Sequence, residues 1–413
     1  MLAAALVSLA ACGGNPPREP ARADSAAPAV AAPEAAAQAA GAPAGRAAPA
    51  VPAAARKLTV GAVGDMMLGT DYPENRLPDD DGVYFLDDVA AILREPDITF
   101  GNLEGVLQDG GEAAKECANP RNCYLFRSPA RYVQHFVEAG FDVLSLANNH
   151  ARDFGEDGRS ATMRTLDEAG LYHSGRRGDF ASFEANGLRI AVLAFAVTRN
   201  SNLLHDYDGA AATVARFAAD HDIVIVSFHG GAEGLDVTRL PFAEEEYFGE
   251  PRGDVVRFAR LMVDSGADLV LGHGPHVVRA MERYRDRLIA YSLGNFATYY
   301  GISVAGLNGI APILVTTLAG DGRFVEARIF STIQVRPGGP RPDGREQALQ
   351  WLRDLSMQDF RDPGLEFLDD GRVLPAPRGY LRPWPVATAP TAGAADQASV
   401  RQAARSPVPP ARY

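Results

Sequence analysis

Two histidines, His273 and His276, are separated only by Gly274 and Pro275 and follow directly after the apolar run 267–271. A glycine and a proline fix a tight turn and leave the backbone room to approach a ligand. Imidazoles placed where a strand passes into such a turn can converge on one point, as a metal site requires. A lone histidine pair is also found in ordinary loops, so the metal interpretation depends on ligands from elsewhere in the chain.

Matching polar side chains follow four other apolar segments, at 57–63, 97–100, 141–147 and 223–228. The side chains are Asp65, Asn102 with Glu104, Asn149 with His150, and His229. Ligands of open α/β sheets bind at the carboxyl ends of the strands, so we expect all five clusters at one edge of one sheet. Carboxylate, amide and imidazole ligands mixed in this way suit Zn, Mn or Fe, often as a pair of ions.

The elements that must position these clusters alternate between strands and helices. The expected strands are 57–63, 97–100, 141–147, 189–197, 223–228, 269–271 and 288–293, and the expected helices are 84–93, 129–139, 157–169, 210–219, 254–264 and 346–355. Segments 313–318 and 324–335 form an expected hairpin about Asp321-Gly322. This alternation argues for a largely parallel sheet covered on both faces, and the predicted fold class is an α/β layered sandwich with largely parallel or mixed central sheets flanked by helices.

Composition divides the chain of 413 residues into a central domain between two ends rich in Ala and Pro. Residues 13–56 are rich in Ala and Pro and predict a disordered tether, and 383–413 predict a similar tail, which leaves 57–382 as one domain. The formal charge of -12 disfavours a nucleic-acid partner, which would select a basic face. No apolar run reaches the length of about 20 residues that a membrane-spanning helix needs.

Residues 1–12 are apolar and end in Leu-Ala-Ala-Cys12, which resembles the lipobox of bacterial lipoprotein signal peptides. Lipidation at Cys12 would place the protein in the cell envelope, exported and lipid-anchored on the periplasmic or extracellular face. The alternative is an Ala-rich segment with no signal function, since the run is short and has no Lys or Arg before it. Cys117 and Cys123 would form a small disulfide loop in an oxidising compartment, with free thiols or a zinc pair as alternatives.

Six short blocks surround the polar clusters. They are GDMML (64–68), NLEG (102–105), LANNHARDFG (146–155), HGGAE (229–233), GHGPHVV (272–278) and YSLGNF (291–296). In this order they resemble the bacterial CapA family of capsule or poly-gamma-glutamate synthesis proteins, within the metallo-dependent phosphatase-like superfamily. The resemblance covers roughly residues 58 to 298.

The resemblance to metallophosphoesterases implies a role for each ligand candidate. Asp65 and His276 would bind a first divalent ion, and a second ion would be bound by Asn149, His229 and His273. Glu104 would be the carboxylate that bridges the two ions. His150 would lie near the leaving group, as an acid or as a contact to the phosphate. Two departures affect this set: Met66 and Met67 follow Asp65 where the superfamily has x-His, and Glu104 stands where it has Asp. Both departures put standard phosphatase activity in doubt.

Other polar residues of these blocks have two open interpretations each. Asn102, Glu233 and Asn295 either orient ligands or contact substrate, or they only cap turns. Arg152 and Asp153 either contact substrate or form a salt bridge at a helix start.

Three functions follow from the resemblance. The first is a surface-tethered metallohydrolase of phosphoester type that acts on an envelope polymer or its precursor. The second is a non-catalytic assembly component that works with other capsule-synthesis subunits. The third is metal-dependent amide-bond chemistry on polyglutamate.

Overall fold

The computed structural model of this chain describes residues 56–115 and 123–377. The segment 1–12 with Cys12, nearly all of the tether 13–56 and the tail 383–413 lie outside the described residues, so the domain boundaries stay predictions. Within the described part, no helix combines the length and the apolarity that crossing a membrane demands.

A ten-stranded mixed sheet forms the first layer, in the order β19-β20-β17-β16-β1-β2-β5-β6, with β15 paired to β1 and β18 to β17. Its strands are β1 (Lys57–Met67), β2 (Ile98–Leu103), β5 (Val143–Ser145), β6 (Tyr172–Ser174), β15 (Asn295–Thr298), β16 (Ile310–Ala319), β17 (Phe324–Gln334), β18 (Pro340–Pro342), β19 (Leu365–Phe367) and β20 (Arg372–Pro375). β1, β2, β5 and β6 run parallel, whereas the hairpin β16–β17 joins β1 in antiparallel fashion. The predicted hairpin is therefore confirmed.

A six-stranded sheet forms the second layer, in the order β13-β14-β12-β9-β8-β7. Its strands are β7 (Ala181–Ala185), β8 (Leu188–Ala196), β9 (Ile223–His229), β12 (Leu269–His273), β13 (Met281–Tyr284) and β14 (Arg287–Ala290). The four central strands are parallel, and both edge strands are antiparallel. Short two-stranded sheets pair β3 (Val106–Leu107) with β4 (Arg127–Ser128) and β10 (Glu245–Tyr247) with β11 (Glu250–Gly253).

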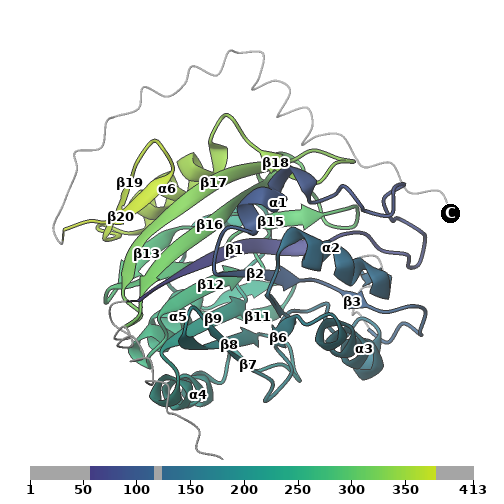
Figure 1. The fold of residues 1–413 in the computed structure, drawn as a ribbon, viewed down its shortest axis with the longest axis horizontal. Coiled ribbons are helices and arrows are strands. Elements are labelled where there is room, and N and C mark those ends of the chain that lie inside the picture. The colour runs from purple at the N-terminus through teal and green to yellow at the C-terminus, as the bar shows by residue number, and fades with distance from the viewer. Residues whose placement is uncertain (1–55, 116–122, 378–413) are drawn as a thin grey trace, which may run out of the picture. The chain divides into compact units, whose positions relative to one another are not determined.

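Helices flank both sheets (Figure 1), and the last of them packs on β13, β16 and β17 in the core that the two sheets share. They are α1 (Asp87–Leu93), α2 (Val133–Ala139), α3 (Gly155–Glu168), α4 (Tyr207–Asp220), α5 (Val255–Asp264) and α6 (Gln347–Asp359). β1 is buried on both faces: Leu58, Val60 and Ala62 pack with the second sheet, whereas Val63 packs with α1 and α2. Met66 also packs with α1 and α2, because the register of β1 shifts between Ala62 and Asp65 and interrupts the alternation. The predicted α/β fold, with mixed sheets flanked by helices, is confirmed.

The expectation of one sheet with all five polar clusters at a single edge is wrong. The strands that precede Asp65, Glu104 and Asn149 belong to the ten-stranded sheet, whereas those of His229 and His273 belong to the six-stranded one. The pattern of strands and helices cannot reveal this division, because it records the order of the strands and not which strand bonds to which. A face of β1 that we expected helices to cover is covered by the second sheet instead.

Candidate metal centre

β1 places Asp65 where the strand passes closest to the loop before β15. The pairing register of β1 with β2 shifts between Ala62 and Asp65, an irregularity that re-aims the side chains that follow it. Gly64 lies so close to Gly294 that a Cβ atom there would stand 1.9 Å from the Gly294 carbonyl oxygen. The Asp65 amide donates a hydrogen bond of 2.9 Å to that same oxygen. A glycine at 64 is thus what lets the backbone present Asp65 at the end of the sheet.

The Asp65 carboxylate joins residues from both sheets. Asn102 at the end of β2 donates from Nδ2 to Asp65 Oδ1 over 2.8 Å. His273 at the end of β12 places Nδ1 at 3.4 Å from Oδ1, and His276 places Nδ1 at 3.1 Å from Oδ2. Asp65, Asn102 and His273 are completely buried.

Glu104 and His229 form a second contact between the sheets. The Glu104 amide donates to the Met66 carbonyl over 2.9 Å, which holds Glu104 beside Asp65. Glu104 Oε1 lies 3.4 Å from His229 Nδ1, and both side chains are buried. His229 is the last residue of β9 and pairs in register with His273 of β12, so the two imidazoles leave neighbouring strands side by side.

Several buried atoms of this cluster have no hydrogen-bond partner among the described residues. They are Asp65 Oδ2, both carboxylate oxygens of Glu104, Asn149 Oδ1, His229 Nε2 and both ring nitrogens of His273. A buried polar atom without a hydrogen bond costs about 1–3 kcal/mol, so a concentration of them in one place requires a compensating ligand. Carboxylate oxygen, amide oxygen and imidazole nitrogen are donors for a divalent cation, and the residues therefore fit a metal centre.

The tightest group consists of Asp65, Glu104 and His276, whose ligand atoms all lie within 4.8 Å of one another. Two carboxylates and one imidazole at this separation can hold a metal ion. The identity and number of ions, and the share of His229, His273 and Asn149 in binding them, stay predictions.

Burial and mutual charge shift the pKa values in this cluster in opposite directions. Burial, together with the neighbouring Asp65 carboxylate, raises the pKa of Glu104 to about 8. Burial opposes the charging of His276, but Glu104, Asp65 and Glu233 outweigh it and raise the His276 pKa to about 10. Burial lowers the pKa of His229 well below its usual value, which keeps that imidazole neutral. Such shifts are expected where acidic and basic side chains are buried close together and no cation neutralises the carboxylates.

A chain of hydrogen bonds links Asp65 to His150. Asn102 Oδ1 accepts from Asn148 Nδ2 over 3.2 Å, and Asn148 Oδ1 accepts from the His150 amide over 3.0 Å. His150 Nδ1 lies 2.8 Å from Asp153 Oδ2, in the geometry of a histidine oriented by a carboxylate. Asp153 therefore supports His150, and its ion pair is with Lys115, over 3.1 Å. The predicted salt bridge is made by the neighbouring residue, since Arg152 lies 3.4 Å from Glu156.

The remaining predicted residues also reach the cluster. Asn295 pairs with Asp65 in the β1–β15 register, and its Oδ1 lies 2.8 Å from His276 Nδ1. Glu233 Oε2 lies 3.8 Å from His276 Nε2. His276 has a positive φ of 59°, and Asn295 and Asn308 donate to its carbonyl oxygen, which stabilises this backbone conformation. Asn102, Glu233 and Asn295 thus contact the ligand candidates, and their role in orienting ligands or binding substrate stays a prediction.

Two residues of the site were missed by the sequence interpretation. Lys115 places Nζ at 3.1 Å from Asp153 Oδ1 and 3.3 Å from His150 Nδ1. Arg252 is 1% exposed and pairs with Glu233 over 2.8 Å. No motif surrounds Lys115 in the sequence, and Arg252 precedes a helix as many surface arginines do. Cys123 takes part in a disulfide, whereas its predicted partner Cys117 lies outside the described residues.

Together, the fold and the site define an α/β protein of two packed sheets with a candidate metal centre where their strands end. Residues 59–300, more than half of the chain, match the family of bacterial capsule synthesis proteins called PGA_cap, and the chain belongs to that family.

The chain is similar to proteins of Bacillus species. It is 31% identical over 275 residues to the capsule biosynthesis protein CapA of Bacillus anthracis, which covers 60% of this chain and 62% of that protein. It is 30% identical over 259 residues to the PGA biosynthesis protein CapA of Bacillus subtilis, with 58% and 63% covered. The match thus spans less than two thirds of the length of these relatives. Among solved structures, a purple acid phosphatase from yellow lupin is similar with a TM-score of 0.34 and 11% identity, over 72% of this chain and 56% of that one.

Proposed function

We propose that this protein acts in the synthesis of a capsule polymer or of poly-gamma-glutamate, as a metal-dependent hydrolase of phosphoester type. Membership of the capsule synthesis family and similarity to two proteins named CapA support the process. One observation supports the proposed metal-dependent hydrolase activity: buried oxygen and nitrogen atoms without hydrogen-bond partners among the described residues gather where the two sheets meet.

The proposed centre holds two divalent ions, of Mn, Zn or Fe. Asp65 and His276 would hold one ion, Asn149, His229 and His273 would hold the other, and Glu104 would be a ligand shared by both. Divalent ions held there would supply Lewis-acid chemistry toward a phosphoester linkage. Asn102, Asn295 and Glu233 keep the ligand side chains in place through the contacts described above.

His150 is the proposed proton donor to the departing oxygen. Asp153 accepts the hydrogen bond of Nδ1, which leaves Nε2 as the ring nitrogen that exchanges a proton with substrate. Burial lowers the pKa of His150, which makes its imidazolium a stronger acid. Lys115 adds a positive charge beside the same ring.

We further propose that the protein is exported and is anchored in the cell envelope through a lipid at Cys12. The lipobox-like segment 1–12 supports this location, as does the disulfide of Cys123, because disulfides persist in oxidising compartments. An envelope polymer or its phosphoester precursor is then the substrate, and other capsule-synthesis subunits are the partners.

Metal analysis of the purified full chain, followed by turnover assays on phosphodiesters and phosphomonoesters, tests the proposed activity. We expect bound metal and turnover that are both lost in Asp65→Asn and His276→Ala. The matched control is His221→Ala, because His221 lies before β9, at the end of that strand opposite His229.

Two results would replace this proposal by one of the alternatives. A chain without bound metal or turnover that co-purifies with polymer synthase subunits would indicate an assembly component. Release of glutamate oligomers from poly-gamma-glutamate, sensitive to Asp65→Asn, would indicate amide-bond chemistry at the same centre.

A further inference from the structure

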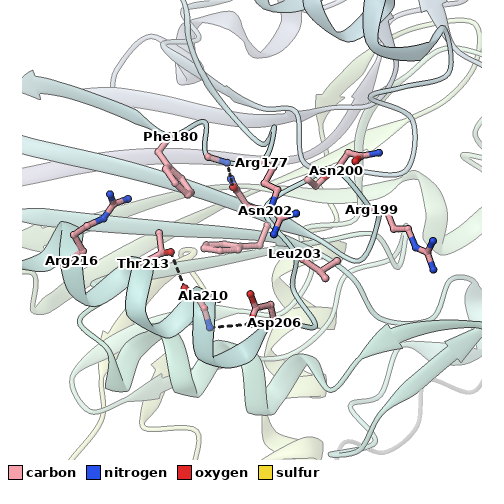
Figure 2. A pocket seen from close by; sticks show the side chains of 14 residues that line it. Arg177, Phe180, Arg199, Asn200, Asn202, Leu203, Asp206, Ala210, Thr213 and Arg216 are labelled. Atoms are coloured by element: carbon pink, nitrogen blue, oxygen red, sulfur yellow. Dashed lines mark hydrogen bonds between the residues drawn. The ribbon is translucent and has the colours of Figure 1, made fainter.

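A pocket of about 640 Å³ opens beside α4, away from the ligand candidates of the metal centre. The segment after β6 and the loop between β8 and α4 form its walls (Figure 2). Arg177, Arg199 and Arg216 line it together with Phe180 and Phe195. None of the residues assigned to the metal centre borders this pocket, so it is a separate feature of the fold.

The pocket concentrates positive charge in an acidic chain. Arg177, Arg199 and Arg216 are exposed, and none of them pairs with a carboxylate of residues 56–115 or 123–377. The one carboxylate in the lining, that of Asp206, accepts a hydrogen bond from the Gly209 amide and caps α4. Three guanidinium groups therefore face one carboxylate, in a chain whose formal charge is -12.

The three arginines are spread along the pocket and do not converge. Figure 2 shows Arg177 over the middle of the pocket, Arg216 at one end and Arg199 at the other. A single phosphate or carboxylate could not reach all three, whereas an extended chain with repeated negative charges could. The ring of Phe180 is half-buried and adds an apolar surface between the charges; it packs against the buried ring of Phe195 with a centroid separation of 6.4 Å. Methylene groups between carboxylates would pack on such a surface, and a polyphosphate has none to offer.

The pocket lies along the same strand ends as the metal centre. Ala196 at the end of β8 pairs in register with His229 at the end of β9. Thr198, in the loop that continues into the pocket, donates from its hydroxyl to the Asn148 carbonyl oxygen over 3.3 Å. Asn148 in turn accepts from the His150 amide. The pocket wall and the proposed proton donor are thus joined through one residue.

We propose that this pocket binds a stretch of an extended polycarboxylate chain and holds it beside the candidate metal centre. The choice of poly-gamma-glutamate as that chain rests on the proposed function. Arg177, Arg199 and Arg216 contact successive carboxylates, and Phe180 contacts the methylene groups between them.

The test measures binding of fluorescently labelled poly-gamma-glutamate to the full chain by anisotropy. Arg177→Gln combined with Arg216→Gln should weaken binding by about tenfold, which is about 1.4 kcal/mol, because each substitution removes one exposed charged contact with the polymer. Arg341→Gln is the matched control: Arg341 is exposed on β18 and borders no part of the pocket, so the affinity should not change. Circular dichroism of each variant checks that the fold is kept.

Asp65→Asn separates this proposal from the proposed activity. This substitution should abolish metal-dependent turnover, while the affinity for the polymer stays at the wild-type value. If the wild-type chain binds the polymer but shows no turnover, only the proposed hydrolase activity is contradicted. Unchanged affinity in the double arginine variant, or no binding to the wild type, would overturn the pocket assignment. Tighter binding of polyphosphate with the same arginine dependence would also overturn it, in favour of a phosphate polymer.

Discussion

In the metal-free protein, the acidic and basic side chains of the candidate metal centre shift one another's pKa values. Glu104 is buried against Asp65, and His276 is held charged by three carboxylates. His150 has other direct partners, Asp153 and Lys115, although the charge of Glu233 acts on the pKa of both His150 and His276. Substitutions at Lys115 and Asp153 therefore probe His150 through contacts that His276 does not make.

Metal binding should strengthen as the pH rises from about 6 to about 9, because metal ligands must be deprotonated. With pKa values of about 8 for Glu104 and about 10 for His276, both hold a proton in the metal-free protein at pH 7. A cation must displace these protons, and a higher pH removes them in advance. Calorimetry of Mn²⁺ or Zn²⁺ binding, in two buffers that differ in ionisation enthalpy, measures the protons released. Affinity that is independent of pH, with no proton release, would contradict the assignment of these ligands.

Replacement of Lys115 by Met should raise the pKa of His150, because the Lys115 ammonium opposes a second positive charge at 3.3 Å. Asp153→Asn should lower that pKa, because the carboxylate stabilises the imidazolium. An NMR titration of the His150 ring proton measures both shifts. Lys57→Met, at the exposed start of β1, is the control. Shifts of the same sign in the two variants would be inconsistent with the observed arrangement.

Among the secondary-structure elements, β1 does most to position the candidate metal centre. It bonds to β2, β15 and β16, presents opposite faces to two cores and carries Asp65 two residues before its end at Met67. Its irregular register near Gly64 is possible only because the loop at Gly294 can approach the backbone there. The geometry of the candidate metal centre is therefore tied to a backbone contact as well as to ligand side chains.

Gly64→Ala should destabilise the fold by about 3 kcal/mol, the upper range for overpacking a buried position. The added Cβ would lie 1.9 Å from the Gly294 oxygen, so both backbone segments must move. Urea unfolding of the metal-free protein measures this change, and metal affinity should fall with it. Gly344→Ala is the matched control, since a Cβ at 344 meets no atom within 4 Å. Equal midpoints for the two variants would contradict the close approach.

The whole molecule assembles the candidate centre from two sheets. Asp65 and Glu104 come from the ten-stranded sheet, whereas His229 and His273 come from the six-stranded one. A cation bound among them would connect the two layers as well as neutralise their charges. Loss of metal should thus affect the stability of the entire described domain and not only the loops of the site.

Saturating metal should raise the melting temperature of the protein, and EDTA should return it to the metal-free value. An ion present at a hundred times its Kd stabilises the native state by about 2.7 kcal/mol. Differential scanning calorimetry of the wild type with and without Mn²⁺ or Zn²⁺ measures the shift. Asp65→Asn should show none, while His221→Ala should respond as the wild type does. A shift of equal size in Asp65→Asn would indicate that the ion binds elsewhere.

The sequence by itself determined the α/β class, most strands and helices to within a few residues, and the polar clusters at strand ends. These features depend on local pattern: β9 is a continuous apolar run that ends at His229, and α5 has the spacing of a helix with one buried face. The order of the motif blocks was likewise sufficient to identify the family. Each of these signals lies within a few neighbouring residues.

Only the tertiary structure decided how the strands divide between two sheets, and therefore that the candidate centre lies between layers. It also decided that Lys115 and Asp153 support His150, that Arg252 pairs with Glu233, and that three arginines share one pocket. Such contacts join residues far apart in the chain, as with Lys115 and His150, and the periodic pattern of neighbouring residue types does not predict them. They follow from which surfaces are buried together, a property that the chain acquires when its two sheets pack.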